Sequence, residues 1–122
     1  MPLVIVDAAN VVGSVPDGWW RDRHGATERL RDALAPLAAS GVGPYPGPVE
    51  LLLVVEGAAR GVQTIPGVRV VPAPASGDDT IVDLVRDAAR PCLVITADRN
   101  LRERVTALGA EVAGPSAVRD LL

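Results

Sequence analysis

Short runs of branched apolar residues alternate along the chain with longer segments in which apolar residues recur every three to four positions. The short runs predict five strands, at Leu3–Val6, Glu50–Val55, Val68–Val71, Cys92–Thr96 and Ala110–Val112. The longer segments predict helices, over Thr27–Ala39, Asp79–Ala89, Leu101–Leu108 and Ser116–Leu122, with a short helix or turn over Gly57–Val62.

Strands that alternate with helices predict an α/β fold, an open five-stranded parallel sheet with helices on both faces. The strands are almost continuously apolar, as expected when both faces of a sheet are buried. Ser40–Pro48 is rich in Gly and Pro and predicts a stiff surface loop, and Pro36 is expected to break or kink the helix before it. Residues 1–122 show no linker or repeat and are expected to form one domain.

The composition is that of a folded domain, with 48% hydrophobic and 22% charged residues. Fifteen acids against 12 bases give a net charge of −3, so a nucleic acid partner would need local basic residues rather than bulk attraction. All 12 bases are Arg. The absence of Lys excludes Schiff-base enzymes, P-loop nucleotide enzymes and phosphoacceptor receiver domains.

Cys92 is the only cysteine and lies in an apolar run, so it favours buried core over a disulfide or a cysteine metal cage. A reduced, cytoplasmic setting is therefore expected. No signal-peptide pattern opens the chain, and no apolar run approaches the roughly 20 residues needed to cross a bilayer, so no membrane partner is expected.

Acidic residues follow the predicted strands. Ligands of open α/β sheets bind beyond the carboxyl ends of the strands, so these positions are informative. They are Asp7 after the first strand, Glu56 after the second, Asp78 and Asp79 after the third, and Asp98 after the fourth. Each acid taken alone also has a structural explanation, since Asp78 and Asp98 are placed to cap helices.

Several carboxylates at one edge repel each other, by roughly 4 kcal/mol for a pair 4 Å apart at an effective dielectric of 20. A divalent cation offsets this repulsion, and oxygen ligands suit Mg²⁺ or Mn²⁺. Such a site can activate water for attack on a phosphodiester. No nucleophilic triad competes, because the only histidine, His24, lies in an arginine-rich loop and is interpreted as a surface residue.

Four motifs resemble the NYN branch of the PIN-like nucleases, above all the small bacterial YacP-like NYN domains. They stand in order along the chain, at Val4–Gly13, Val55–Gly57, Gly77–Val82 and Thr96–Arg99. The resemblance implies a metal-dependent ribonuclease, classed as an endoribonuclease, on a five-stranded parallel sheet. It implies Mg²⁺ or Mn²⁺ as cofactor and RNA as substrate.

Carried over residue by residue, the resemblance assigns catalytic roles to Asp7, Asn10, Asp78, Asp79 and Asp98, and metal binding to Asp7, Asp79, Asp98 and Glu56. Asn10 would orient the first ligand or the substrate phosphate, and Thr96 fits a Ser/Thr-x-Asp arrangement at the substrate side. Two features depart from the family pattern. Glu56 stands where an Asp is common, and Ala8-Ala9 replaces a pair that commonly contains Gly.

Asp83 follows Asp79 by one helical turn, so it is either an additional metal ligand or a solvent residue paired with Arg86. The segment Ser14–His24 leaves the first strand beside the proposed site, and aromatic rings with nearby arginines can stack bases and hold phosphates. The candidate substrate-binding residues are Ser14, Trp19, Arg21, Thr96 and Arg99, with Arg102 and Arg60 as further rim candidates. The alternative is that the tryptophans anchor the loop.

A second hypothesis is a catalytically inactive RNA-binding or protein-interaction module of the same fold. A haloacid dehalogenase phosphatase is excluded, because that class needs an Asp at the position of Ala9 and a lysine. The apolar C-terminal residues Val118, Leu121 and Leu122 either close a homodimer or cap the sheet.

Overall fold

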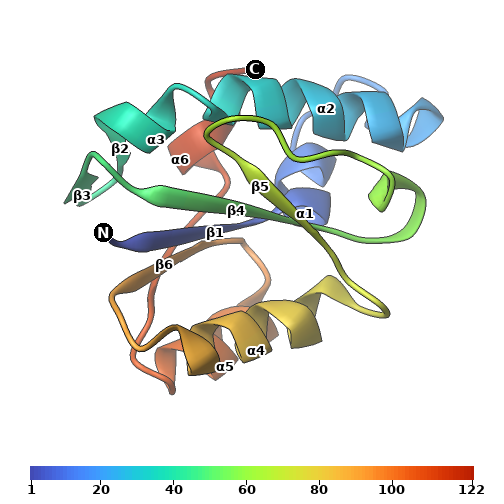
Figure 1. The fold of residues 1–122 in the computed structure, drawn as a ribbon. Helices are drawn as coiled ribbons and strands as arrows, with labels where there is room; N and C mark the ends of the chain where they lie inside the picture. The colour runs from blue at the N-terminus through green and yellow to red at the C-terminus, as the bar shows by residue number, and fades with distance from the viewer.

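The computed structural model describes all 122 residues and contains a five-stranded parallel sheet at its centre (Figure 1). The sheet has the order β5-β4-β1-β6-β7, and every neighbouring pair is parallel. Its strands are β1 (Leu3–Asp7), β4 (Glu50–Val55), β5 (Arg69–Pro72), β6 (Cys92–Ile95) and β7 (Glu111–Ala113). The predicted five-stranded parallel α/β sheet is therefore confirmed.

Helices cover both faces of the sheet, as Figure 1 shows. On one face lie α1 (Ala8–Gly13), α2 (Arg23–Leu34), α3 (Leu37–Ser40) and α6 (Ser116–Arg119), and on the other α4 (Gly77–Ala88) and α5 (Arg99–Thr106). Alternate residues of β1 pack against the helices on opposite faces of the sheet. Val4 and Val6 pack in the cluster that includes Leu30 of α2, while Ile5 packs in the cluster that includes Ile81 of α4.

The helix after β1 was not predicted from the sequence. Ala8–Gly13 contains two valines and ends in Gly, which have low helix propensity. Val11 and Val12 are buried in the core beneath α2, so tertiary packing outweighs local preference here. The segment Ser40–Pro48, predicted to be a loop, contains a short hairpin. Its two strands of two residues each, β2 (Gly41–Val42) and β3 (Tyr45–Pro46), pair antiparallel.

Several predicted helix ends differ from the structure. The first long helix begins at Arg23 rather than Thr27, because the Asp22 side chain accepts a hydrogen bond from the Gly25 amide and caps it. It ends at Leu34, and a separate short helix follows Pro36, as the expected break indicates. The α4 and α5 helices begin about one half-turn earlier than predicted, and α6 stops at Arg119.

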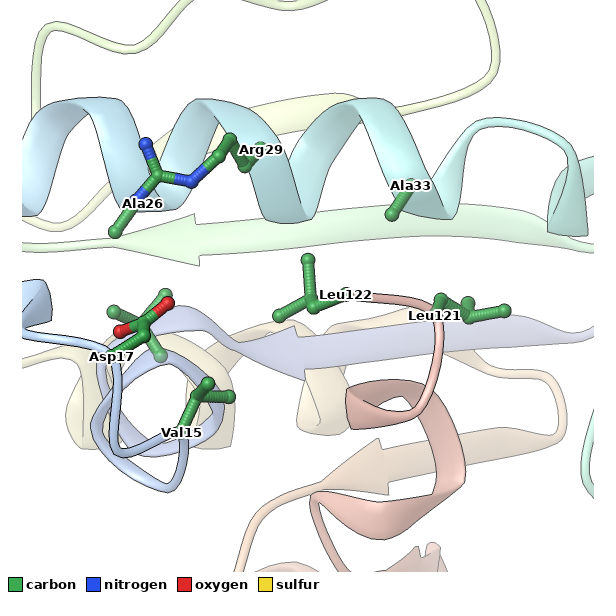
Figure 2. A pocket seen from close by; sticks show the side chains of 8 residues that line it. Val15, Asp17, Ala26, Arg29, Ala33, Leu121 and Leu122 are labelled. Carbon is green, nitrogen blue, oxygen red and sulfur yellow. The ribbon is translucent and has the colours of Figure 1, made fainter.

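Two short 3₁₀ helices complete the chain, η1 (Trp19–Arg21) and η2 (Gly57–Ala59), the second within the predicted short helix or turn. None of the helices combines the length and apolar character required to cross a bilayer. At the C-terminus Val118 is buried, whereas Leu121 and Leu122 remain about half exposed and line a pocket beside α2 (Figure 2). The homodimer through these leucines stays a prediction.

Candidate active site

The strand order places the candidate site at the topological switch point of the sheet. Strand β1 lies at the centre of the sheet. After β1 the chain adds β4 and β5 on one side, and it then adds β6 and β7 on the other side, so the direction of strand addition reverses at β1. Asp7 ends β1, Glu56 follows β4, and Thr96 and Asp98 follow β6. Three separate segments therefore deliver acidic side chains to the carboxyl edge of the same three adjacent strands.

Asp7 is the buried centre of this site. Only 6% of the residue is exposed, and its Oδ2 accepts a hydrogen bond of 2.9 Å from the Thr96 hydroxyl. Thr96 is fully buried, and its Oγ1 also accepts a 3.1 Å hydrogen bond from the Asp98 amide. Thr96 therefore links the two segments that carry Asp7 and Asp98. Its hydroxyl is buried and bonded to Asp7, so it is not exposed to contact a substrate as the sequence prediction had it.

The surroundings of Asp7 disfavour its charged form. Burial raises the pKa of Asp7 from 3.8 to about 6, and the nearby charges of Asp78 and Glu56 add to this rise. The hydrogen bond from Thr96 and the backbone amide of Asn10 act in the opposite direction but do not cancel it. A strongly perturbed carboxyl group at a switch point is typical of a functional site.

The start of α4 brings Asp78 to the same place. Ser76 caps the helix by accepting a hydrogen bond from the Asp79 amide, and the Gly77 amide donates a 2.7 Å hydrogen bond to Oε2 of Glu56. This second bond ties α4 to the end of β4. Burial raises the pKa of Asp78, and the charges of Asp98 and Glu56 raise it further.

The charges of Asp78 and Glu56 thus act on Asp7, and those of Asp98 and Glu56 act on Asp78. We call these four acids the carboxylate cluster. Asp79 was predicted as a metal ligand, and Asp83 either as a further ligand or as a solvent residue paired with Arg86. The structure pairs both acids with arginines, which for Asp83 is the second alternative. Oδ1 of Asp79 lies 3.0 Å from Nη2 of Arg104 on α5, and Oδ1 of Asp83 lies 2.8 Å from Nη1 of Arg86 within α4. Asp78, the neighbour of Asp79, is the acid of α4 that interacts with Asp7.

Asn10 joins α1 to the turn that carries Asp98. Its Oδ1 accepts a 2.8 Å hydrogen bond from the amide of Ala97. Asp98 in turn caps α5, because its Oδ1 accepts a 2.9 Å hydrogen bond from the Leu101 amide. The structure thus gives Asn10 a positioning role across 87 residues of sequence, and one oxygen of Asp98 is already occupied by the helix.

The donor set of the carboxylate cluster suits a hard divalent cation, since it offers carboxylate oxygens. Burial, and to a lesser extent the charges of the neighbouring acids, raise the pKa of both Asp7 and Asp78. No three acidic, histidine or cysteine side chains come close enough together to hold a metal ion by themselves, so Asp7, Asp79 and Asp98 do not form a ready group. Mg²⁺ commonly uses only one or two protein carboxylates and keeps several waters, which is compatible with this arrangement.

Two arginines follow Asp98 on α5. Arg99 and Arg102 line a shallow depression of about 370 Å³ together with the exposed Ala97 and the acid Glu103. Arg104 is the base that lowers the pKa of Asp78, although burial and the neighbouring acids outweigh it. Arg104 was not predicted as a site residue, because nothing in its sequence spacing shows that α5 directs this side chain toward α4.

The substrate-binding candidates on the Ser14–His24 segment differ in their environments. The Ser14 hydroxyl donates a 2.6 Å hydrogen bond to the Val11 carbonyl and so closes the end of α1. Arg21 is exposed and lies over the exposed ring of Trp20. Trp19 is partly buried and packs against the core, and Arg23, which was not among the sequence candidates, lies over its ring.

Comparisons with solved structures agree with this fold. Two crystal structures of Rae1 (YacP) from Bacillus subtilis are similar to the chain. One has 18% identity and a TM-score of 0.79 and covers 99% of this chain and 74% of that one. The other, of a point mutant, has 16% identity and a TM-score of 0.71 and covers 98% and 73%. The expected YacP-like fold is confirmed.

No protein-family model and no curated protein matches the sequence.

Proposed function

We propose that the chain is a metal-dependent ribonuclease that hydrolyses phosphodiester bonds of RNA at the carboxylate cluster. The observation that carries the proposal is the buried Asp7 at the switch point, with Asp78 and Glu56 close enough to raise its pKa. The likeness of the fold to Rae1 (YacP) supports the same assignment. The resemblance of the four sequence motifs to the NYN branch of the PIN-like nucleases supports it independently.

Asp7 and Asp78 are the residues that would hold Mg²⁺ or Mn²⁺, with Glu56 and Asp98 beside them. A bound divalent cation would lower the pKa of a coordinated water and offset the charge of the phosphate. Thr96 keeps Asp7 in place by its hydrogen bond to Oδ2, and Asn10 fixes the turn that bears Asp98. Arg99 and Arg102, which follow Asp98 on α5, are the candidates to bind the substrate phosphates through their guanidinium groups.

A cleavage assay tests this proposal. End-labelled single-stranded RNA is incubated with the purified protein and Mg²⁺, Mn²⁺ or EDTA. We expect cleavage with either metal and none with EDTA. Asp7→Asn is expected to lower the rate at least about 100-fold. Substituting a residue that supports a metal ligand lowers metal affinity or activity by up to about 100-fold, and loss of the ligand itself is expected to cost at least as much.

Asp87→Asn serves as the matched control, since Asp87 is an exposed acid near the far end of α4. It is expected to cleave RNA like the unmodified protein. Equal activity in EDTA, in Asp7→Asn and in the unmodified protein would refute the enzyme assignment. RNA binding without turnover under every metal condition would instead support the catalytically inactive RNA-binding module.

A further inference from the structure

A pocket of about 380 Å³ opens between α1, η1, α2 and the turn after β4, next to the carboxylate cluster. We infer that this pocket binds an unpaired nucleobase of the RNA, in the nucleotide adjacent to the phosphate that is cleaved. The inference rests on the proposed function for its location relative to the cleaved bond. Its lining includes Ala8, Trp19, Arg23, Glu56, Gly57 and Ala59.

The wall of the pocket carries the aromatic and cationic groups that bases favour. The guanidinium carbon of Arg23 lies 5.2 Å from the centre of the Trp19 ring, and both side chains line the pocket. Stacking on aromatic rings and on arginine planes binds bases without regard to sequence. The neighbouring Trp20 is 59% exposed and does not line the pocket, so the two tryptophans have different environments.

The rest of the lining fits a flat ligand with polar edges. Small side chains dominate it, at Ala8, Ala9, Ala59 and Ala75. The Thr27 hydroxyl is already used within α2, where it donates to the Arg23 carbonyl. The charged side chains of the lining are Arg23, whose guanidinium is a hydrogen-bond donor, and Glu56, whose carboxylate is an acceptor and uses Oε2 for the Gly77 amide.

The pocket is joined to the carboxylate cluster by shared residues. Glu56 belongs to both, and Ala8 directly follows Asp7 in the chain. Oε2 of Glu56 accepts a hydrogen bond from the Gly77 amide, so this side chain is fixed between α4 and the pocket. A base in the pocket therefore places its own sugar and phosphate at the edge of the cluster. A free phosphate would not need an aromatic wall.

Tryptophan fluorescence tests this inference without any cleavage. In Trp20→Phe, Trp19 is the only tryptophan, and in Trp19→Phe only Trp20 remains. The probes are adenosine 5′-monophosphate and ribose 5-phosphate, titrated into each protein in EDTA after circular dichroism has confirmed the fold. We expect adenosine 5′-monophosphate to quench the emission of Trp19 saturably, and ribose 5-phosphate to leave it unchanged.

Arg23→Gln in the Trp20→Phe background is expected to weaken the binding of adenosine 5′-monophosphate about tenfold, which is the loss typical of one stacking contact. The matched control is Arg29→Gln, which removes the same charge from the same helix outside this pocket. It is expected to leave binding unchanged. Equal weakening by both variants would show attraction by charge alone and would overturn the inference.

Quenching by both probes, or quenching of Trp20 alone, also overturns the inference. Base-specific quenching of Trp19 in a protein that cleaves no RNA leaves the pocket standing and refutes the ribonuclease assignment. Metal-dependent cleavage by a protein whose Trp19 ignores adenosine 5′-monophosphate refutes the pocket and leaves the ribonuclease assignment intact.

Discussion

The single side chain on which most of the site depends is Asp7, and its position costs stability. An acid with a pKa of 3.8 unfolded and about 6 folded retains its proton longer in the folded state, so the folded state loses stability as the pH rises through this window. A rise of this size corresponds to roughly 3 kcal/mol once the carboxyl group is ionised in both states. Costs of this kind are common at functional sites, where stability and activity trade off.

Asp7→Asn is therefore expected to stabilise the metal-free protein at neutral pH. Asn keeps an oxygen that can accept the hydrogen bond from Thr96 and removes the buried charge. Urea unfolding in EDTA measures the effect. The stability gained over the unmodified protein should grow by roughly 2 to 3 kcal/mol between pH 4 and pH 7.5. A gain that is the same at both pH values would contradict the assignment of the pKa shift to Asp7.

Asn10 provides a second test with one side chain. Asn10→Ala removes the acceptor for the Ala97 amide, which is exposed and can turn to water instead. The expected loss of stability is only about 1 kcal/mol, as for one hydrogen bond. The loss of cleavage is expected to be about tenfold or more, because the turn that carries Asp98 is released. Thermal unfolding and cleavage rates measure the two effects, and a proportional loss of both would indicate a merely structural role.

A contact between α4 and α5 bears on the proposed cation site. The pair of Asp79 and Arg104 is largely exposed, so Arg104→Gln is expected to change stability by no more than about 1 kcal/mol. The same substitution removes the base that lowers the pKa of Asp78. Binding of Mn²⁺, measured by calorimetry, should therefore become a few-fold tighter, because Arg104 no longer opposes the cation.

The control for this experiment is Arg86→Gln, since Arg86 pairs with Asp83 on the exposed side of α4. It should leave Mn²⁺ binding unchanged. Weaker binding in Arg104→Gln would instead show that Arg104 orients Asp79 as a ligand, which is the role that the sequence resemblance gives to Asp79.

The elements that could be predicted from the sequence are those whose pattern reflects burial. The five strands could be predicted because central strands are apolar up to their last residue, as in Leu3–Val6. The α4 helix could be predicted because Ile81 and Val85 repeat on one side. The short α1 was not readable, since its valines favour strands in isolation and become helical only when packed under α2.

The acids of the site could be predicted for a similar reason, because parallel strands end at one edge whatever the details of packing. Which acid of the pair Asp78-Asp79 faces Asp7 could not be predicted. Successive residues on a helix point about 100° apart, so the answer depends on how α4 is rotated against the sheet. The Gly77 bond to Glu56 and the Arg104 bond to Asp79 fix this rotation, and both partners are distant in sequence.

The net charge of the chain bears on how it would bind the RNA that is proposed as its substrate. With a net charge of −3 there is no bulk attraction to a polyanion, so the affinity would have to come from a few arginines and from base stacking. Arg23 is assigned to the base in the pocket, which leaves Arg99 and Arg102 as the arginines proposed to contact phosphates. Two phosphate contacts to single-stranded RNA predict that the logarithm of the binding constant falls with the logarithm of the salt concentration with a slope of about −1.4.

This slope is measured by fluorescence anisotropy of a labelled single-stranded RNA that is titrated with the Asp7→Asn protein. The titrations run at roughly 50 to 300 mM KCl, where the effect of counterion release on the binding constant is resolved. Arg99→Gln should lower both the affinity and the slope, since it removes a phosphate contact. Trp19→Phe should lower the affinity at every salt concentration and leave the slope unchanged, because stacking releases no counterions. A slope much steeper than about −1.4 would mean that RNA also binds along other arginines.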